Sequence, residues 1–349
     1  MSARGRLDKG VRRASDTDPR LVEVGLAGRG LSREQVVDIQ RSRLKAGVVA
    51  AIEELGYERV TVGQITARAR VSRRTFYELF ANREECFVAV MDDVTAQVER
   101  ELAAAGVADL PWRERVRTGL GVILEFLERE PVLARVCVVQ SARASGLVQE
   151  RRAAVLAGIA GVLDQGRLQS ARGEGHSALT AEGLVGALLA IVQARLTGGS
   201  RGSFHELQGN LMGMIVLPYL GAAAARREQA RPFSPGGRTG TQTGAAPLLP
   251  LVGDPLHGVP MRVTYRTARV LAGVHEHPGA SNRQVAAYAG IGDPGQVSKL
   301  LRRLERLGLL ENRGLGHAQG EPNAWWLTDQ GALVARGIGV HAAGRRRAA

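Results

Sequence analysis

Cysteine, aromatic residues and long apolar runs are all scarce in this 349-residue chain. Two cysteines, Cys86 and Cys137, are too few for a disulfide framework or a Cys-based zinc site, and they suit a reducing compartment. The basic N-terminus has no apolar stretch behind it, so we expect no secretory signal. The longest uncharged run, residues 207–225, contains polar residues and Pro218, which favours a buried helix over a transmembrane span. The composition therefore predicts a cytoplasmic protein that does not contact membranes.

Acidic residues are also in deficit, because 34 Asp and Glu face 47 Lys and Arg, giving a net charge of +13. Such a surplus predicts an anionic partner, most often nucleic acid. Lysine is rare while Ala and Gly are abundant, so we attribute the arginine excess to compositional bias rather than to guanidinium chemistry at each position. The surplus lies mainly at the two ends, with +3 in residues 1–31 and +7 in residues 261–349.

Breaker-rich and aperiodic stretches divide the chain. Residues 231–260 are rich in Pro and Gly and predict a linker, whereas residues 1–31 lack hydrophobic periodicity and predict a disordered basic arm. Between them, apolar residues recur at helical spacing. The predicted fold is mainly α, with an arm (1–31), a helix-turn-helix domain (32–88), a helical body (89–230), the linker (231–260), a small α+β winged-helix domain (261–340) and a basic tail (341–349).

Capping patterns place the helix-turn-helix. Thr61 and Gln64 form a capping box that opens a helix through about Ala69, and Ser72 caps a second helix over residues 73–80. An earlier helix begins after Ser32, and a later one after Asn82. Since the first turn of such a second helix reaches base edges in the major groove, its polar residues are candidates for base reading: Ser72, Arg73, Arg74 and Thr75.

Phosphate contacts are expected beside this turn. The Tyr77 hydroxyl is near enough to reach a phosphate, and the helix after Asn82 offers free backbone amides with Arg83 beside them. Phe76 and Phe80 are expected to pack inward. The alternative is a plain helical hairpin whose arginines are merely solvated.

A family resemblance is carried by residues 56–62 (GYERVTV) and 65–87 (ITARARVSRRTFYELFANREECF). These stretches closely resemble the DNA-binding domain of TetR/AcrR-type transcriptional regulators, over roughly residues 38–88. The resemblance implies that Tyr77 contacts a phosphate, that residues 73–75 approach bases, and that Arg83 lies near the DNA backbone. The candidate DNA-contacting residues are Thr61, Arg70, Ser72, Arg73, Arg74, Thr75, Tyr77 and Arg83.

Arg70 departs from the family pattern, which has Gly before the Val of the turn. A residue with a side chain costs about 1–2 kcal/mol in a left-handed conformation. The departure predicts either an adjusted turn or an additional basic contact.

The helical body is expected to continue from residue 84 to 104 and then over residues 112–129, 131–141, 148–170, 180–196 and 204–227. The TetR resemblance implies that the last two helices pair with their copies in a homodimer. Small residues would allow that close approach: Gly183, Gly186, Ala187, Ala190, Gly209, Gly213 and Gly221. The alternative is that both helices belong to the monomer core.

The same resemblance implies a pocket for a small-molecule effector between the long connecting helix and the dimer pair, which makes residues 89–230 a ligand-binding and dimerisation domain. Residues available to line it are Trp112, Phe126, Leu127, Val136, Cys137 and Gln140. An apolar wall with few polar groups suits a ligand, although a helical core needs the same residues.

The C-terminal region changes pattern. Helices are expected over residues 264–276, 283–289 and 294–307, followed by strands 309–313 and 324–327, a Gly-rich tip at 314–323, and a helix after Thr328. This order is a winged helix, and residues 296–310 (QVSKLLRRLERLGLL) resemble the winged-helix modules of MarR-like regulators. Its recognition helix and wing would present Gln296, Ser298, Lys299, Arg302, Arg303, Arg313 and His317 to a second DNA contact.

Catalytic and metal-binding constellations are missing from the pattern, so we expect no enzyme activity, metal or cofactor. The sequence predicts a sequence-specific DNA-binding transcriptional regulator, a ligand-responsive repressor that acts as a homodimer on a palindromic operator of double-stranded DNA. The alternative is a non-specific DNA binder, or a protein-docking scaffold that uses the winged helix for interaction.

Overall fold

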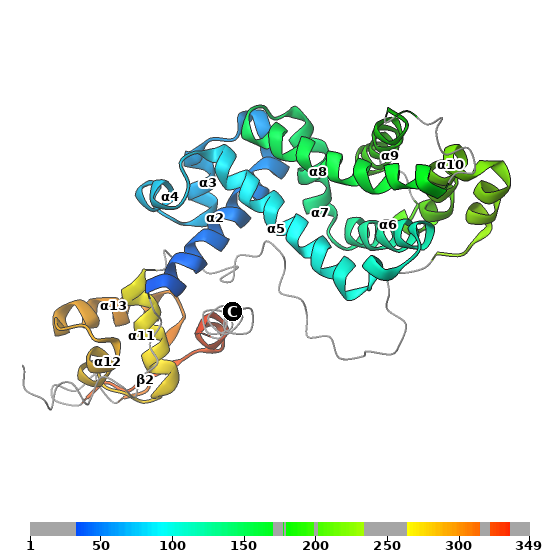
Figure 1. Cartoon of the computed structure of the whole chain (residues 1–349). Helices are drawn as coiled ribbons and strands as arrows, with labels where there is room; N and C mark the ends of the chain where they lie inside the picture. Colours follow the sequence, from blue (N-terminus) through cyan, green and yellow to red (C-terminus); the bar gives the residue numbers. More distant parts are fainter. Residues whose placement is uncertain are drawn as a thin grey trace, which may run out of the picture. The chain divides into compact units, whose positions relative to one another are not determined.

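The computed structural model describes residues 33–169, 177, 179–198, 202–233, 264–314 and 322–335 (Figure 1). The expectations for the N-terminal arm, the Ser32 cap, residues 234–260 of the linker, His317 and the basic tail fall outside these ranges. The described residues form two compact units, 34–233 and 264–335, and each is treated by itself.

The first unit begins with five helical segments, whose ends follow the local sequence. They are α2 (Arg33–Leu55), η1 (Tyr57–Arg59), α3 (Val62–Ala69), α4 (Arg73–Leu79) and α5 (Arg83–Ala104). Gly56 ends α2 with a φ of 76°. Gly47 lets α2 and α3 approach closely, since a Cβ there would lie 2.9 Å from the Ile65 carbonyl oxygen.

The body follows as η2 (Val107–Asp109), α6 (Trp112–Arg129), α7 (Pro131–Ala134), η3 (Arg135–Gln140), η4 (Ser141–Arg143), α8 (Leu147–Asp164), η5 (Gln165–Gln169), α9 (Leu179–Thr197), η6 (Phe204–Leu207) and α10 (Gln208–Ala230). The single helix predicted over residues 131–141 is wrong in detail, because η3 is a wider π-helical turn. The helix predicted over residues 148–170 tightens into the 3₁₀ segment η5 after Asp164.

Segment α10 is a helical hairpin, not the continuous helix predicted over residues 204–227. Gly221 has a φ of 79° and a ψ of 176°, which no helix contains. The segment after it folds back, so that a Cβ at Gly209 would lie 2.8 Å from the Gln229 carbonyl oxygen, and one at Gly213 would meet the Gln229 side chain. The prediction that Gly209 and Gly213 admit a second copy is therefore corrected, because the chain's own Gln229 occupies their surface.

One apolar core joins the helix-turn-helix to the body. Ile52 of α2 and Phe87 of α5 pack in the same cluster as Phe126 of α6 and Val136 of η3. A second cluster gathers around Trp112, whose indole nitrogen donates to the Val162 carbonyl over 2.9 Å. The helix-turn-helix is thus continuous with the body and has no separate core of its own.

The apolar helices α9 and η6–α10 are long and apolar enough to cross a membrane by length and composition. Met212, Ile215 and Val216 of α10 are instead buried in the body. Within the described residues, the part of α10 before Gly221 therefore packs in the core, as expected for a buried helix there.

The C-terminal unit contains α11 (Tyr265–Glu276), α12 (Asn282–Ala289), α13 (Pro294–Arg306), β1 (Leu310–Asn312) and β2 (Trp325–Leu327), and residues 329–335 are helical. The two strands are antiparallel, with Glu311 opposite Trp326, and are shorter than predicted. Asn282 ties the elements together, because its side chain accepts from Trp325 Nε1 over 2.5 Å and donates to Ser298 Oγ over 2.9 Å.

Candidate nucleic-acid interface

The turn between α3 and α4 has a left-handed residue at its centre. Arg70 adopts φ 52° and ψ 38°, and its N–H donates to the Ala67 carbonyl. The next amide, from the buried Val71, donates to the Thr66 carbonyl over 3.1 Å. Both bonds satisfy carbonyls that α3 would otherwise leave open at its end. The turn is therefore closed by backbone hydrogen bonds, with the Arg70 side chain exposed to solvent.

The start of α3 is fixed by the predicted capping box. The Thr61 side chain accepts from the Gln64 amide over 3.3 Å, and the Gln64 side chain accepts from the Thr61 amide over 2.8 Å. A Cβ at Gly63 would lie 2.8 Å from Arg73 Nη2, so the Arg73 guanidinium lies against this first turn. The start of α3 and the start of α4 are thereby adjacent.

The first turn of α4 is capped by Ser72. Its hydroxyl oxygen accepts from the Thr75 amide over 3.0 Å and lies 2.8 Å from the Thr75 hydroxyl. The two hydroxyls engage each other within the turn. Phe76 and Phe80 are buried beneath α4, as the sequence predicts.

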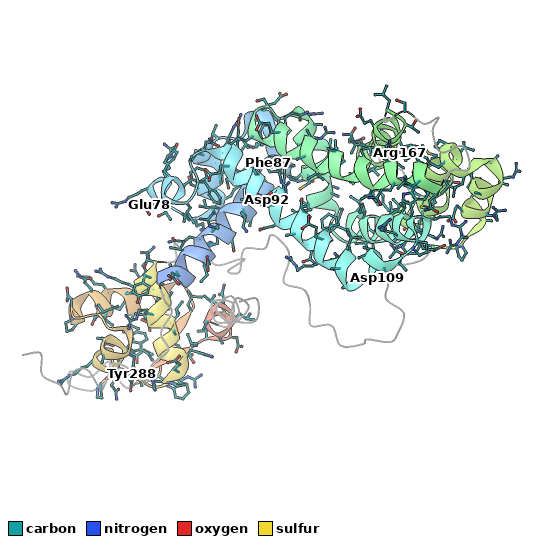
Figure 2. All side chains as sticks on the ribbon, in the orientation of Figure 1. Glu78, Phe87, Asp92, Asp109, Arg167 and Tyr288 are labelled. Carbon is teal, nitrogen blue, oxygen red and sulfur yellow. The ribbon has the colours of Figure 1, made fainter. Side chains whose placement is uncertain are left out.

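The outer face of α4 carries the exposed candidates. Arg73 and Arg74 are exposed, and Tyr77 leaves 60% of its surface open to solvent. Arg74 Nε lies 2.9 Å from the Glu78 carboxylate, one helical turn on. Figure 2 shows Glu78 pointing outward from α4. Arg73 and Tyr77 are therefore presented to solvent by a helix that Phe76 and Phe80 anchor to the core.

Arg83 has a structural role that the sequence did not suggest. Its guanidinium donates to the carbonyl oxygens of Tyr57, Glu58 and Val60, and lies 5.1 Å from the centre of the Tyr57 ring. These bonds fasten the start of α5 to η1. The phosphate contact assigned to Arg83 stays a prediction, and it would have to be made by a side chain already bonded to three carbonyls.

A short contact path runs from the body to this interface. The Gln140 side chain accepts from the Tyr57 amide over 3.3 Å, which joins η3 to η1. Arg135, at the other end of η3, pairs with Glu53 of α2. From the opposite side, Gln193 of α9 donates to the Val138 carbonyl over 3.2 Å. The π-helical turn therefore contacts both α9 and the helix-turn-helix.

The apolar candidate pocket residues fall in two core clusters. Trp112 packs against Tyr219 in the second cluster, whereas Phe126, Leu127 and Val136 are buried in the first. Burial raises the pKa of the Cys137 thiol to about 12, so this thiol is protonated and behaves as an apolar group. A pocket formed by all six stays a prediction.

In the C-terminal unit, α13 places its candidates on its outer side. Gln296, Lys299, Arg302 and Arg303 are exposed, and Ser298 is half-buried beneath the Asn282 amide. Arg313 follows β1 and lies over the Trp326 ring, 4.9 Å from its centre. Across the residues that the structure describes, no three His, Cys, Asp or Glu side chains are placed together to hold a metal ion.

Comparison with known proteins assigns the N-terminal segment. Residues 47–90 match the family of bacterial regulatory proteins called the tetR family. These residues, from the second half of α2 into α5, are therefore a TetR-family helix-turn-helix domain.

Similar whole proteins are more distant. The chain is 30% identical over 73 residues to an uncharacterized HTH-type transcriptional regulator, YhgD of Bacillus subtilis strain 168, and the match covers 21% of this chain and 38% of that protein. Among solved structures it is similar to the fatty acid degradation regulator FadR of Bacillus halodurans, at 16% identity over 51% of this chain and 94% of that chain, with a TM-score of 0.43. It is also similar to the regulator RolR in complex with resorcinol, at 20% identity over 58% of this chain and 98% of that chain, with a TM-score of 0.40.

Proposed function

We propose that this protein is a transcriptional repressor that binds a palindromic operator as a homodimer and releases it when a small molecule binds the helical body. The observation that carries the proposal is the outer face of α4, within a TetR-family helix-turn-helix domain. Arg73 and Tyr77 are exposed there, on a helix whose opposite side is buried. Arg73 is assigned to base edges and Tyr77 to a phosphate, because only the first turn reaches deep into the groove.

Homodimerisation is proposed through α9. Gly183 and Gly186 lie on its outer side, where a Cβ at either would meet nothing within 4 Å, and Leu179 at its start is exposed. An apolar helix that lacks a cover on one side is typical of a protein–protein contact. A two-fold axis beside α9 would relate the two α4 helices of a dimer, one from each chain. The two half-sites that they contact should lie about one turn of the DNA helix apart, or a multiple of it.

The proposed response to an effector uses η3. This turn is bonded to α9 on one side and, through Gln140, to the Tyr57 amide on the other. π-helical turns occur frequently at functional sites. A ligand that shifts η3 would move η1 and α3 relative to the partner's reading helix, with a coupling free energy of about 1–3 kcal/mol.

The test of DNA binding uses duplexes selected from a random pool by the full-length protein. We expect Arg73→Ala to relax the preference at one position of the selected sequence, by about tenfold. Tyr77→Phe should weaken binding to all duplexes alike, because phosphates carry no sequence. Arg227→Ala, at an exposed position of α10, is the matched control. Equal affinity of the wild-type protein for every duplex would refute the proposal in favour of non-specific binding.

A further inference from the structure

The C-terminal unit repeats the backbone design of the TetR-family motif. Helix α12 has eight residues, as α3 does, and it opens with a capping box between Ser281 and Gln284. It ends on Gly290 at φ 57° and ψ 40°, close to the φ 52° and ψ 38° of Arg70. The two helices therefore begin and end in the same way.

The turns that follow are also closed alike. The Ile291 amide donates to the Ala286 carbonyl over 3.0 Å, just as the Val71 amide donates to Thr66 over 3.1 Å. A capping side chain then starts the second helix. In α13 this is Asp293, whose carboxylate accepts from two backbone amides, and these bonds hold the pKa of Asp293 below its usual range. The C-terminal turn differs by one additional residue before its cap.

The outer face of α13 is cationic. Val297, Leu301 and Leu304 are buried on its inner side. Away from that side, the exposed charged and amide side chains are Gln296, Lys299, Arg302, Arg303, Glu305 and Arg306, with four cations and one carboxylate. In the part of the chain that the structure describes, Lys299 and Arg303 take part in no ion pair. At one helical face, Gln296, Lys299 and Arg303 follow each other at spacings of three and four residues.

We propose that this unit is a second site for double-stranded DNA, with α13 in the major groove. Glutamine pairs bidentately with adenine, so Gln296 supplies a donor and an acceptor for a base edge, while Lys299 and Arg303 contact the flanking phosphates. Arg266 Nη1 of α11 donates to Gln296 Oε1 over 2.7 Å and so restrains this side chain. A side chain with a fixed position loses less freedom when it reads a base.

The residues on the outer face of α13 favour DNA over a protein as the partner. Cores of protein interfaces are depleted in lysine and glutamate, and enriched in aromatic residues and in arginine. The exposed residues of α13 include Lys299 and Glu305 and no aromatic residue, so the face lacks the aromatic anchor of a protein interface, and its four cations outnumber its one carboxylate. Phosphates would neutralise these cations and release counterions, which gives binding a steep dependence on salt.

The experiment measures the affinity of the full-length protein for a random-sequence duplex of fixed length over a series of KCl concentrations. The variant is Lys299→Gln with Arg303→Gln, and the matched control is Arg226→Gln with Arg227→Gln, which removes the same charge from exposed positions of α10. We expect the α13 variant to lose about tenfold in affinity and to lower the salt slope by about 1–2, since each phosphate contact contributes about 0.9. The control should behave as the wild type does.

The same measurement in a background with Tyr77→Phe separates this proposal from that of the preceding subsection. A loss caused by the α13 variant in both backgrounds supports the second site, whether or not Tyr77→Phe has an effect of its own. Wild-type affinity and salt slope in the α13 variant would overturn the second site and would favour protein docking. Since Lys299 and Arg303 are exposed, we expect the variant to fold as the wild type does, and circular dichroism spectra check this.

Base recognition by α13 is tested separately, by selecting duplexes from a random pool with the full-length protein. We expect Gln296→Ala to change one part of the selected sequence and to leave the part that depends on Arg73 unchanged. An identical selected sequence with Gln296→Ala would overturn base reading by α13.

Discussion

Arg70 occupies a backbone conformation that residues with side chains adopt at a cost. Its φ of 52° makes it the single non-glycine residue with positive φ among those that the structure describes. The turn keeps its hydrogen bonds in spite of this, so the strain is retained without a local change of fold. An exposed guanidinium at the turn is a reason for retaining an arginine there, because the turn adjoins the proposed phosphate contacts.

The prediction at this position separates stability from binding. We expect Arg70→Gly to raise the free energy of unfolding by about 1 kcal/mol in urea, because glycine adopts the left-handed region without strain. Affinity for duplex DNA should fall severalfold, with a lower salt slope, because a cation beside the phosphates is lost. Arg70→Asn is the control, since it tolerates the same backbone but has no charge. A decrease in stability with Arg70→Gly would contradict this account.

Individual residues were predictable from sequence where their partners are near in the chain. Thr61, Ser72 and Asn82 cap their helices as expected, since a cap depends on residues two or three positions away. Arg83 and Gln140 were not predictable in the same way. Their partners lie 23 or more residues away, and only the packed core brings them together.

Helices α6 and α10 are fastened by ion pairs at the end of the body. Arg117 and Glu228 are buried and lie 2.8 Å apart, and Arg117 also donates to the Pro232 carbonyl over 2.6 Å. Beside them, Arg231 donates two hydrogen bonds to Glu114. The hydrogen bonds from Arg231 hold the pKa of Glu114 below its ordinary value of 4.5.

This fastening predicts a dependence on pH. A carboxyl whose pKa is lowered in the folded state stabilises the fold above its unfolded pKa, and the contribution is lost as pH falls through the folded pKa. We expect Glu114→Gln to lower the free energy of unfolding near pH 7 by less than about 1 kcal/mol, since the pair is partly exposed. The difference from the wild type should shrink below about pH 4. Urea unfolding at several pH values checks this, with Glu182→Gln of α9 as control.

An unchanged difference between pH 7 and pH 3 would contradict the role of the Glu114 charge. In that case the side chain would contribute through packing alone.

At the level of elements, helix positions were predictable and helix breaks were not. The cap and Pro signals located α6, α11 and α13 closely, because periodicity and caps are local. Gly221 looked like one of several small residues suited to close approach. In the structure Gly221 is the break in α10, and the second half of α10 approaches Gly209 and Gly213 instead. Sequence shows that a backbone can come near a glycine, but it does not show which backbone.

The whole molecule is expected to depend on its α9 face for assembly. A Cβ at Gly186 would meet no atom of its own chain within 4 Å, so an arginine there has room in the monomer. Its long charged side chain would instead enter the proposed contact with the second copy. We expect Gly186→Arg to leave the chain folded but to convert the dimer into a monomer in sedimentation velocity. Ala104→Arg, at an exposed position of α5, is the matched control. A Gly186→Arg protein that sediments as the wild type does would contradict dimerisation through α9.

Division of the chain into two units follows composition, since Pro and Gly between them leave few residues able to build a core. In the described part of the chain, the second compact unit starts at Thr264. The continuity of the core between helix-turn-helix and body was not visible in sequence. Periodicity shows that a face is buried, and only the packing shows that α2, α5, α6 and η3 bury their faces together.

The π-helical turn η3 sets the direction of the residues that follow it, so a variant with one residue fewer in η3 would change that direction. An α-helix turns about 100° for each residue, so one residue more or fewer rotates all that follows by that angle. Residues 135–140 accommodate a surplus residue in a widened loop, which keeps Gln140 directed at the Tyr57 amide and Val138 at Gln193. Deleting one residue there would let the helix wind regularly and would turn Gln140 away. The proposed path from α9 through Gln140 would then be broken, while the shared apolar core would still join α2 and α5 to the body.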